Sequence, residues 1–487
     1  MSHAPAGLLA VALFAGTGWA LTALVPALRK LRRAERLGHA YLLGLAWVCT
    51  ALYALSHCAG ARLRLSTTLA VAAVPVAAAV VARLAAKRHH PRPLIPVPSP
   101  ILNLPPRDGR RALPRIAAVA FAAVVSLALF ADALGTPPAD WDGRMTWGAQ
   151  ARWLFAAGTV DPPVLLEKRW SVSHPQYPLL LPIAQGVAFE IQGAADDDRA
   201  ARPLYAAFFP ALLAILYGRC RRWLGARTAA WVLLAAVNIP LLSFAGESGA
   251  RSGYSDLPLA CFYGAGLLLL LSRPRLSEGL AAGLLLAAAV LTKNEGLPLA
   301  VAALLLGAGS AMLRLRRRAG LRAAVPVAAA LLAVLAAFGL VQSWRSQIPN
   351  REDEGYAALA ARAGVRRLAA NLLPHAETAA PLAVDRMLAR EPWGLFWPAA
   401  LALAAAGARG LRRPPALRLA LAAAAPVAVG LLAYTVHPDP ARLIAVTWNR
   451  MLLHGILPLL LLFGMALRAV LVAARDLRAL TPGPRTR

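Results

Sequence analysis

The stretch that decides the fold runs from residue 276 to residue 313 and reads LSEGLAAGLLLAAAVLTKNEGLPLAVAALLLGAGSAML. As one α-helix its 38 residues would be roughly 57 Å long, whereas the hydrocarbon core of a bilayer is about 30 Å thick. Basic clusters flank both ends, which places both ends on the same side of a membrane. We therefore expect the segment to cross twice and to turn near Lys293-Asn294-Glu295-Gly296.

Similar apolar blocks recur along the whole chain. Its 487 residues are 59% hydrophobic and only 15% charged, whereas soluble domains are typically about half apolar and a quarter charged. Only helices or closed barrels satisfy their backbone groups inside a bilayer, and these Ala/Leu/Val-rich blocks lack the alternation of a barrel strand. We therefore predict an all-α, polytopic transmembrane helical bundle of about 13 spans, with extracytoplasmic loops that carry short interfacial helices. The expected spans are 8–28, 38–57, 67–84, 113–134, 203–218, 228–244, 257–271, 279–291, 296–313, 323–341, 393–407, 417–434 and 452–471.

The distribution of charge predicts the orientation. A formal net charge of +29 could indicate nucleic-acid binding, but most of the basic residues lie in short connections beside apolar blocks. Such connections remain in the cytoplasm, so we expect the N-terminus outside and the C-terminus in the cytoplasm of a multi-pass protein of a cell membrane. The Arg/Ala/Leu-rich composition favours a bacterial inner membrane. The expected cytoplasmic stretches are 29–37, 83–115, 219–227, 273–278, 314–322, 409–418 and 468–487.

The same pattern divides the chain into parts. We expect a three-helix membrane segment (1–86), a basic cytoplasmic linker (87–112), a transmembrane core (113–475) and a cytoplasmic tail (476–487). The core carries two large outer loops, 135–202 and 342–392, and the second contains an amphipathic stretch near Tyr356–Leu373.

Two further features bear on this organisation. If the apolar stretch Pro178–Gly193 crossed the membrane, acidic residues 196–198 would be inside and arginines 219–222 outside. We therefore interpret it as an interfacial or re-entrant segment. The cysteines, which are Cys49, Cys58, Cys220 and Cys261, have no metal or disulfide spacing and are interpreted as packing residues.

Polar residues gather in the first outer loop. Asp140 and Asp142 follow directly after the fourth expected span, beside tryptophans suited to interfacial depth. Such carboxylates could accept a proton from a hydroxyl nucleophile, or they could belong to a solvated loop with an aromatic belt. Downstream, His174 and Tyr177 precede a proline-shaped entrance to the apolar segment, where they could contact a polar headgroup.

Three other positions bring charge to the expected outer face. Asp256 starts the seventh span, where an acid can cap a helix or supply another carboxylate to the outer loop. Lys293 and Glu295 lie between apolar stretches, where charges are usually paired or functional. Arg450 opens the last span on the side that normally lacks arginine, and its guanidinium suits a phosphate.

Together these motifs resemble the GT-C superfamily of membrane glycosyltransferases. The pattern is most similar to that of the protein mannosyltransferase and aminoarabinose lipid A transferase group. The resemblance covers roughly residues 113–470. It rests on the acidic motif at 140–142, the stretch Arg152–Gly158, the Tyr-Pro-Leu-Leu at Tyr177–Leu180, the Asp-Leu-Pro-Leu at Asp256–Leu259, the Leu-Thr-Lys-Asn-Glu-Gly at Leu291–Gly296 and the Asn-Arg-Met-Leu…Pro at Asn449–Pro458.

The resemblance implies an inverting transfer of a sugar from a polyprenyl-phosphate-linked donor to an acceptor hydroxyl, on the extracytoplasmic face. It implies Asp142 as the catalytic base, with Asp140 as the fallback, and Asp256 as a further catalytic acid. Lys293 and Arg450 are implied to bind the lipid phosphate. We add His174, Tyr177 and Glu295 as substrate-binding candidates.

These assignments define the expected partners and the alternatives. The partners are the lipid-linked donor, a lipid, glycan or protein acceptor, and membrane lipids, with no nucleic acid. We assign no metal ligand and no certain cofactor, although a divalent metal is compatible with the resemblance. The alternatives are a polytopic transporter or lipid flippase, which would favour internal repeats and polar residues at the midplane, and a non-catalytic membrane scaffold.

Overall fold

The computed structural model describes residues 3–88, 113–244, 247–272, 274–315, 321–349, 366, 370, 374, 377, 380–437 and 439–480. Within these ranges the regular secondary structure is helical throughout. The basic linker beyond residue 88, the stretch Tyr356–Leu373 apart from residues 366 and 370, and the tail beyond residue 480 lie outside the described residues.

Nine helices in the described ranges are long and apolar enough to cross a membrane. They are α1 (His3–Leu24), α3 (Arg33–Ala59), α4 (Leu65–Arg88), α5 (Leu113–Gly135), α8 (Arg202–Leu224), α13 (Gly296–Arg314), α14 (Val325–Arg345), α19 (Pro414–Val436) and α21 (Ile456–Leu480). Four shorter apolar helices complete the set: α9 (Ala226–Val237), α11 (Asp256–Leu271), α12 (Leu276–Thr292) and α17 (Phe396–Ala406). Each predicted span coincides with one of these helices, and the chain is a polytopic helical membrane protein.

The turn predicted within residues 276–313 is present. Helix α12 ends at Thr292, Lys293 is extended, and α13 begins at Gly296. The chain doubles back so closely that a Cβ atom on Gly296 would lie 1.9 Å from the Ala289 carbonyl oxygen. Only glycine fits at such an approach, so the sequence specifies this turn as well as the helices beside it.

The N-terminal helices pack against the rest of the bundle. Helix α1 lies along α3, and α3 lies along α8. Near its start α3 carries Glu35, which is buried and forms an ion pair with both terminal nitrogens of Arg222 on α8. Near its other end His57 is hydrogen-bonded to Asp161 (3.1 Å) and to the Ser343 hydroxyl of α14 (3.1 Å). Both ends of α3 are thus connected to later elements by polar contacts.

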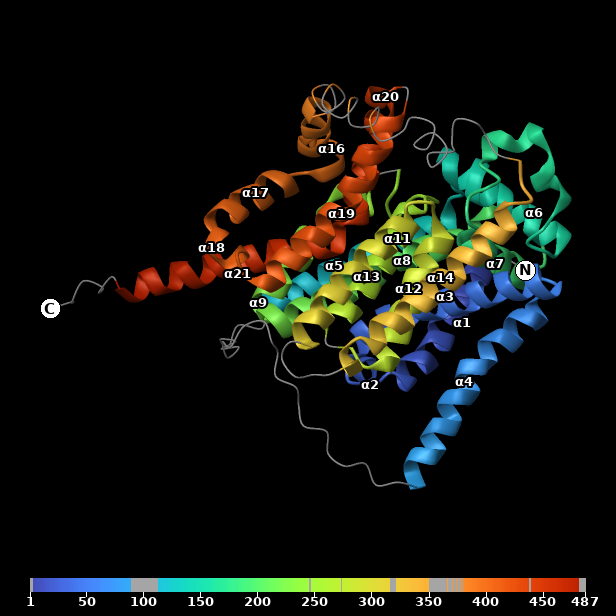
Figure 1. The fold of residues 1–487 in the computed structure, drawn as a ribbon, viewed down its shortest axis with the longest axis horizontal. Coiled ribbons are helices and arrows are strands. Elements are labelled where there is room, and N and C mark those ends of the chain that lie inside the picture. The colour runs from blue at the N-terminus through green and yellow to red at the C-terminus, as the bar shows by residue number, and fades with distance from the viewer. Residues whose placement is uncertain are drawn as a thin grey trace.

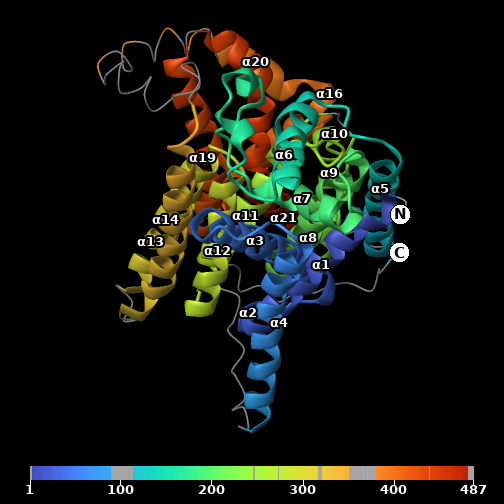
Figure 2. The ribbon, with the colours of Figure 1, turned by 90° about the vertical axis from the view of Figure 1, so that its right-hand side faces the viewer.

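Figures 1 and 2 show how the elements are arranged. In both views α4 extends away from the bundle, and much of its apolar surface is exposed, as expected for contact with lipid. Figure 2 shows the helices α6 (Ala149–Ala157), α10 (Pro240–Ser243), α16 (Arg390–Trp393) and α20 (Pro440–His454) at one end of the bundle. The opposite end carries α2 (Pro26–Arg29). We call the first of these the site end.

The structure differs from the prediction at the start of the last span and at Cys58. The last span is preceded by a separate helix, α20, and the helix axis is interrupted at Gly455, whereas the sequence predicted a loop up to Met451. The stretch predicted as interfacial or re-entrant forms helix α7 (Leu180–Gln192), which is largely buried against α1, α3 and α6, as a re-entrant segment requires. Cys58 is exposed rather than packed, while Cys49, Cys220 and Cys261 are buried.

Candidate functional site

The predicted site residues meet at the site end of the bundle. They come from the loop after α5, the π-helical segment η1 (Asp142–Gly148), the first residue of α11, the α12–α13 turn and helix α20. We call the group formed there the site cluster, which consists of Asp140, Asp142, Asp256, Lys293, Glu295, Arg450 and His454.

Asp256 is the centre of the site cluster. Its side chain is fully buried, and Oδ1 accepts hydrogen bonds from Lys293 Nζ (2.8 Å) and His454 Nε2 (2.9 Å). Oδ2 accepts from Arg450 Nε at 2.9 Å. Asp256 is the first residue of α11, and both of its oxygens bind side chains from other elements, so it does more than favour the start of its own helix. Buried charges persist when they are paired and hydrogen-bonded, and here one carboxylate fixes the positions of three basic side chains.

Arg450 connects this buried centre to the first outer loop. Besides Asp256, its guanidinium contacts Asp142, with Nη2 donating to Oδ2 at 2.9 Å. The Tyr254 ring lies against the guanidinium, 4.7 Å from its central carbon, which is cation–π distance. Burial lowers the pKa of Arg450, but the Asp256 and Asp142 carboxylates outweigh it and hold the pKa above its ordinary value. The arginine therefore remains charged.

Asp140 has a different environment from Asp142. Its two oxygens accept hydrogen bonds from the backbone N–H groups of Gly143 (2.6 Å) and Gly253 (2.9 Å). Burial raises the pKa of the Asp140 carboxyl, and those two backbone hydrogen bonds act in the opposite direction. Because both oxygens already bind backbone, Asp140 joins the start of η1 to the segment before α11.

Gly143 and Gly253 lie at this junction, where a larger residue would not fit. A Cβ atom on Gly253 would lie 2.7 Å from the Gly143 Cα atom, and one on Gly143 would lie 2.5 Å from Asp140 Oδ1. The π-helical form of η1 is also local and unusual, and such turns occur frequently at functional sites. This close approach brings Asp142 within reach of Arg450.

Lys293 and Glu295 complete the cluster from the α12–α13 turn. Lys293 Nζ lies 3.1 Å from Glu295 Oε1, in addition to its bond with Asp256, and the lysine side chain is only 4% exposed. Burial acts to raise the pKa of Glu295, but the lysine charge lowers it below its ordinary value. The predicted Lys293–Glu295 pair is therefore present, and Lys293 also pairs with Asp256.

His174 and Tyr177 lie beside the cluster in a half-buried aromatic stack. Their ring centroids are 4.9 Å apart, and the Tyr177 ring lies 5.5 Å from that of buried Trp147 in η1. Arg345 joins this segment to the α12–α13 turn, because it donates to the Gln176 carbonyl (3.0 Å) and to Asn294 Oδ1 (2.6 Å). The stack and the charged cluster therefore belong to one connected region.

The structure adds residues that the sequence did not place in the site. His454 lies one helical turn after Arg450 on α20, an i, i+4 spacing that could have indicated it. Tyr254 lies two residues before Asp256, and its ring contacts the guanidinium of Arg450, which is far away in the sequence. Asn449 is held by the Trp393 ring N–H at 2.8 Å, a contact between distant residues that no local pattern predicts.

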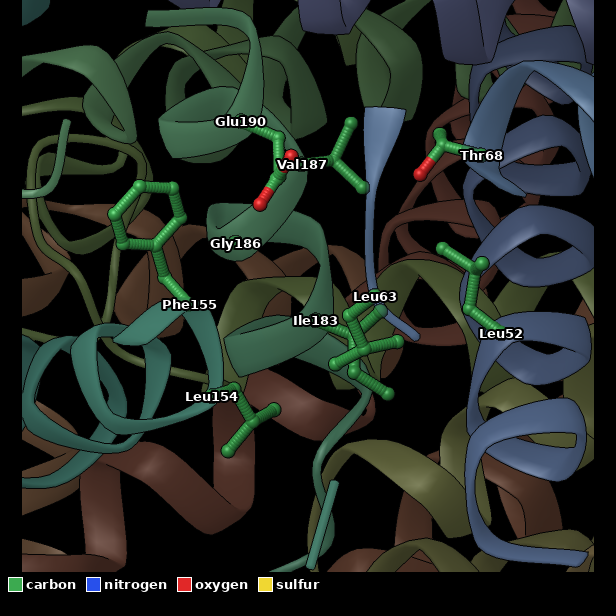
Figure 3. Close-up of a pocket in the computed structure, with 9 residues that line it drawn as sticks. All are labelled: Leu52, Leu63, Thr68, Leu154, Phe155, Ile183, Gly186, Val187 and Glu190. Atoms are coloured by element: carbon green, nitrogen blue, oxygen red, sulfur yellow. The ribbon is translucent and has the colours of Figure 1, made fainter. Parts of the chain in front are cut away.

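A small pocket, with room for about one water molecule, lies away from the cluster, between the N-terminal helices and the segment α6–α7. Figure 3 shows its lining, in which Thr68 and Glu190 supply the oxygen atoms. Both have protein partners, since the Thr68 hydroxyl donates to the Arg64 carbonyl and Glu190 accepts from the Leu65 N–H at 3.1 Å. We therefore interpret this pocket as a small gap between packed helices rather than as a ligand site.

Across the described residues, no group of three or more His, Cys, Asp and Glu side chains is arranged to hold a metal ion. Comparison of the chain with protein-family models, with curated proteins and with solved structures finds no match. The charged residues of the site cluster are therefore the feature of the molecule that points to a function.

Proposed function

We propose that this protein is an integral membrane glycosyltransferase. It would transfer a sugar from a polyprenyl-phosphate-linked donor to an acceptor hydroxyl on the extracytoplasmic face, with inversion. The observation that carries the proposal is the bridge made by Arg450 between Asp142 and the buried Asp256, with Lys293 on the same carboxylate. It sets a candidate base beside two cations that suit a phosphate leaving group.

The chemistry needs only these groups. The sugar is already activated by its phosphate ester, so no nucleotide is required. Asp142 accepts the proton of the acceptor hydroxyl while that oxygen forms the new bond to C1 of the sugar and the C1–phosphate oxygen bond breaks. Arg450 and Lys293 stabilise the negative charge that develops on the lipid phosphate, and the prenyl chain remains in the bilayer.

Other members of the cluster position these groups. Asp256 orients Arg450 and Lys293, and Asp140 holds the backbone on which Asp142 lies. The stack of His174, Tyr177 and Trp147 offers aromatic faces to a sugar or headgroup next to the α12–α13 turn. Glu295 completes the substrate-binding set through its contact with Lys293.

The position of the cluster supports this function over transport. A transporter is expected to bind its substrate near the midplane, between broken helices and internal repeats. Here the charged residues lie at helix ends and in turns: Asp256 is the first residue of α11, and Lys293 and Glu295 lie between two helices. The basic connections at the opposite ends favour placing the site outside the cytoplasm.

Mass analysis of envelope glycans and glycolipids tests the proposal and identifies the sugar. A strain without the gene should lack one sugar modification, the wild-type gene should restore it, and Asp142→Asn should not, although the variant accumulates in the membrane. An unchanged set of glycans and glycolipids in the deletion strain would rule out sugar transfer as the function.

A further inference from the structure

The two carboxylates that bind Arg450 are held very differently. Asp256 is fully buried and shares its oxygens among Arg450, Lys293 and His454. The Asp142 side chain is 19% exposed, and within the described ranges Arg450 is its only side-chain partner. If one of the two ion pairs is to break, it is the pair with Asp142, because Oδ2 of the fully buried Asp256 would otherwise lose its Arg450 partner with no water to replace it.

The bonds of the guanidinium make Asp142 the competitor of an incoming phosphate. Arginine binds phosphate best through two parallel N–H···O bonds. Nε is bound to Asp256, which leaves the edge formed by Nη1 and Nη2, and Nη2 is the nitrogen that contacts Asp142. A phosphate on this edge would lie next to the Asp142 carboxylate, and two anions so close in a poorly hydrated site repel each other.

Arg450 itself stays in place when a phosphate replaces Asp142. Asp256 keeps its bond to Nε, and the Tyr254 ring supports the guanidinium plane. Asp142, in contrast, is the first residue of the short π-helical segment η1. The exchange therefore needs a change in one side chain and leaves the buried part of the cluster unaltered.

We propose that the lipid phosphate of the donor displaces Asp142 from Arg450, and that this exchange releases the carboxylate to act as the base. The proposal rests on the proposed function and adds its regulation. Before the donor binds, the bond from Nη2 to Asp142 Oδ2 holds the carboxylate against Arg450 rather than against an acceptor hydroxyl. The exchange thus frees the carboxylate to turn toward the acceptor hydroxyl once the donor phosphate is bound.

Binding of farnesyl phosphate, an isoprenyl monophosphate, to the full-length protein in lipid nanodiscs tests the exchange. Asp142→Asn removes the competing charge, and so should bind this probe about tenfold more tightly than the wild type. Asp142→Ala, which also removes the charge, should tighten binding to a similar extent. Asp196→Asn is the matched control, because it neutralises an exposed carboxylate of the same outer loop, whose one polar contact within the described part of the chain is with the Gln192 amide at 3.3 Å.

Unchanged or weaker binding by both Asp142 variants would overturn the exchange, as would an equal gain in the Asp196 control, which would indicate a general charge effect. Sugar transfer by the wild type, assayed in parallel, separates the two proposals. Transfer without tighter binding by the variants means that the exchange is wrong while the function stands. Tighter binding without any transfer supports the exchange in a protein that binds a lipid phosphate but is not a glycosyltransferase.

Discussion

Asp256 and Asp142 bind the same arginine, yet their substitution should cost very different amounts of stability. Asp256→Asn leaves Lys293 and Arg450 without the charge that holds them, in a site where Asp256 is fully buried. Breaking a buried ion pair costs about 3–5 kcal/mol. Asp142→Asn removes a partly exposed pair and should cost about 1 kcal/mol or less. Thermal unfolding of the purified variants measures the difference, and equal losses would contradict the assignment of Asp256 as the structural centre.

The glycines around Asp140 provide a second test, of the close approach between η1 and the segment before α11. Gly253→Ala would place a Cβ atom 2.7 Å from the Gly143 Cα atom, which forces the Asp142 backbone away from Arg450. We expect this variant to fold and to lose most sugar-transfer activity, by a factor of about 100, since small displacements of catalytic groups have effects of that size. Gly135→Ala is the control, because a Cβ atom there meets no other atom within 4 Å. Normal transfer by Gly253→Ala would show that the close approach is unimportant.

The sequence predicted which charged residues gather, but not what each one does. Asp142, Lys293, Glu295 and Arg450 were recognisable because charge beside apolar segments is rare. The role of Asp256 was not, since local rules make an acid at a helix start a capping residue, whereas its partners Lys293 and Arg450 are 37 and 194 residues away. Contacts across such separations depend on how helices pack, which no local pattern encodes.

Among the elements, helix α3 is fixed at its start by an asymmetric ion pair. Glu35 is 1% exposed, whereas Arg222 is 38% exposed. Arg222→Ala leaves a buried carboxylate unpaired and should destabilise the protein by about 3–5 kcal/mol. Glu35→Ala leaves an arginine that can turn toward water and should cost less. Thermal unfolding of both variants tests this order, and a larger loss in Glu35→Ala would be inconsistent with it.

Hydropathy predicted the helices well and their interruptions poorly. The turn at 293–296 was predicted because an apolar stretch of 38 residues is too long for one crossing. The break at Gly455 was missed, because apolar residues continue from Leu452 onward on both sides of it. Pro458 cannot donate a helical hydrogen bond to His454, which ends α20 there, and a Cβ atom at Gly455 would lie 2.8 Å from the Ala423 carbonyl oxygen. The resulting separate helix, α20, is the element that presents Arg450 and His454.

At the scale of the whole molecule, Cys58 reports the orientation of the bundle. It is the exposed cysteine, next to His57, whose ring contacts Asp161 and Ser343, whereas Cys49, Cys220 and Cys261 are buried. If basic connections remain in the cytoplasm, Cys58 faces outward. A membrane-impermeant maleimide should then label right-side-out vesicles, and Cys58→Ser should abolish the labelling. Labelling only in inside-out vesicles would place this end of the molecule in the cytoplasm.

The most direct test of the central claim is sugar transfer by the purified protein in liposomes, supplied with polyprenyl-phosphate-linked sugars and the membrane acceptors of its source cell. The wild type and the Asp196→Asn control should transfer sugar, and Asp142→Asn should lose activity by a factor of about 10² to 10⁴, the usual contribution of a general base. Undiminished transfer by Asp142→Asn would contradict the assignment of the base and the mechanism built on it.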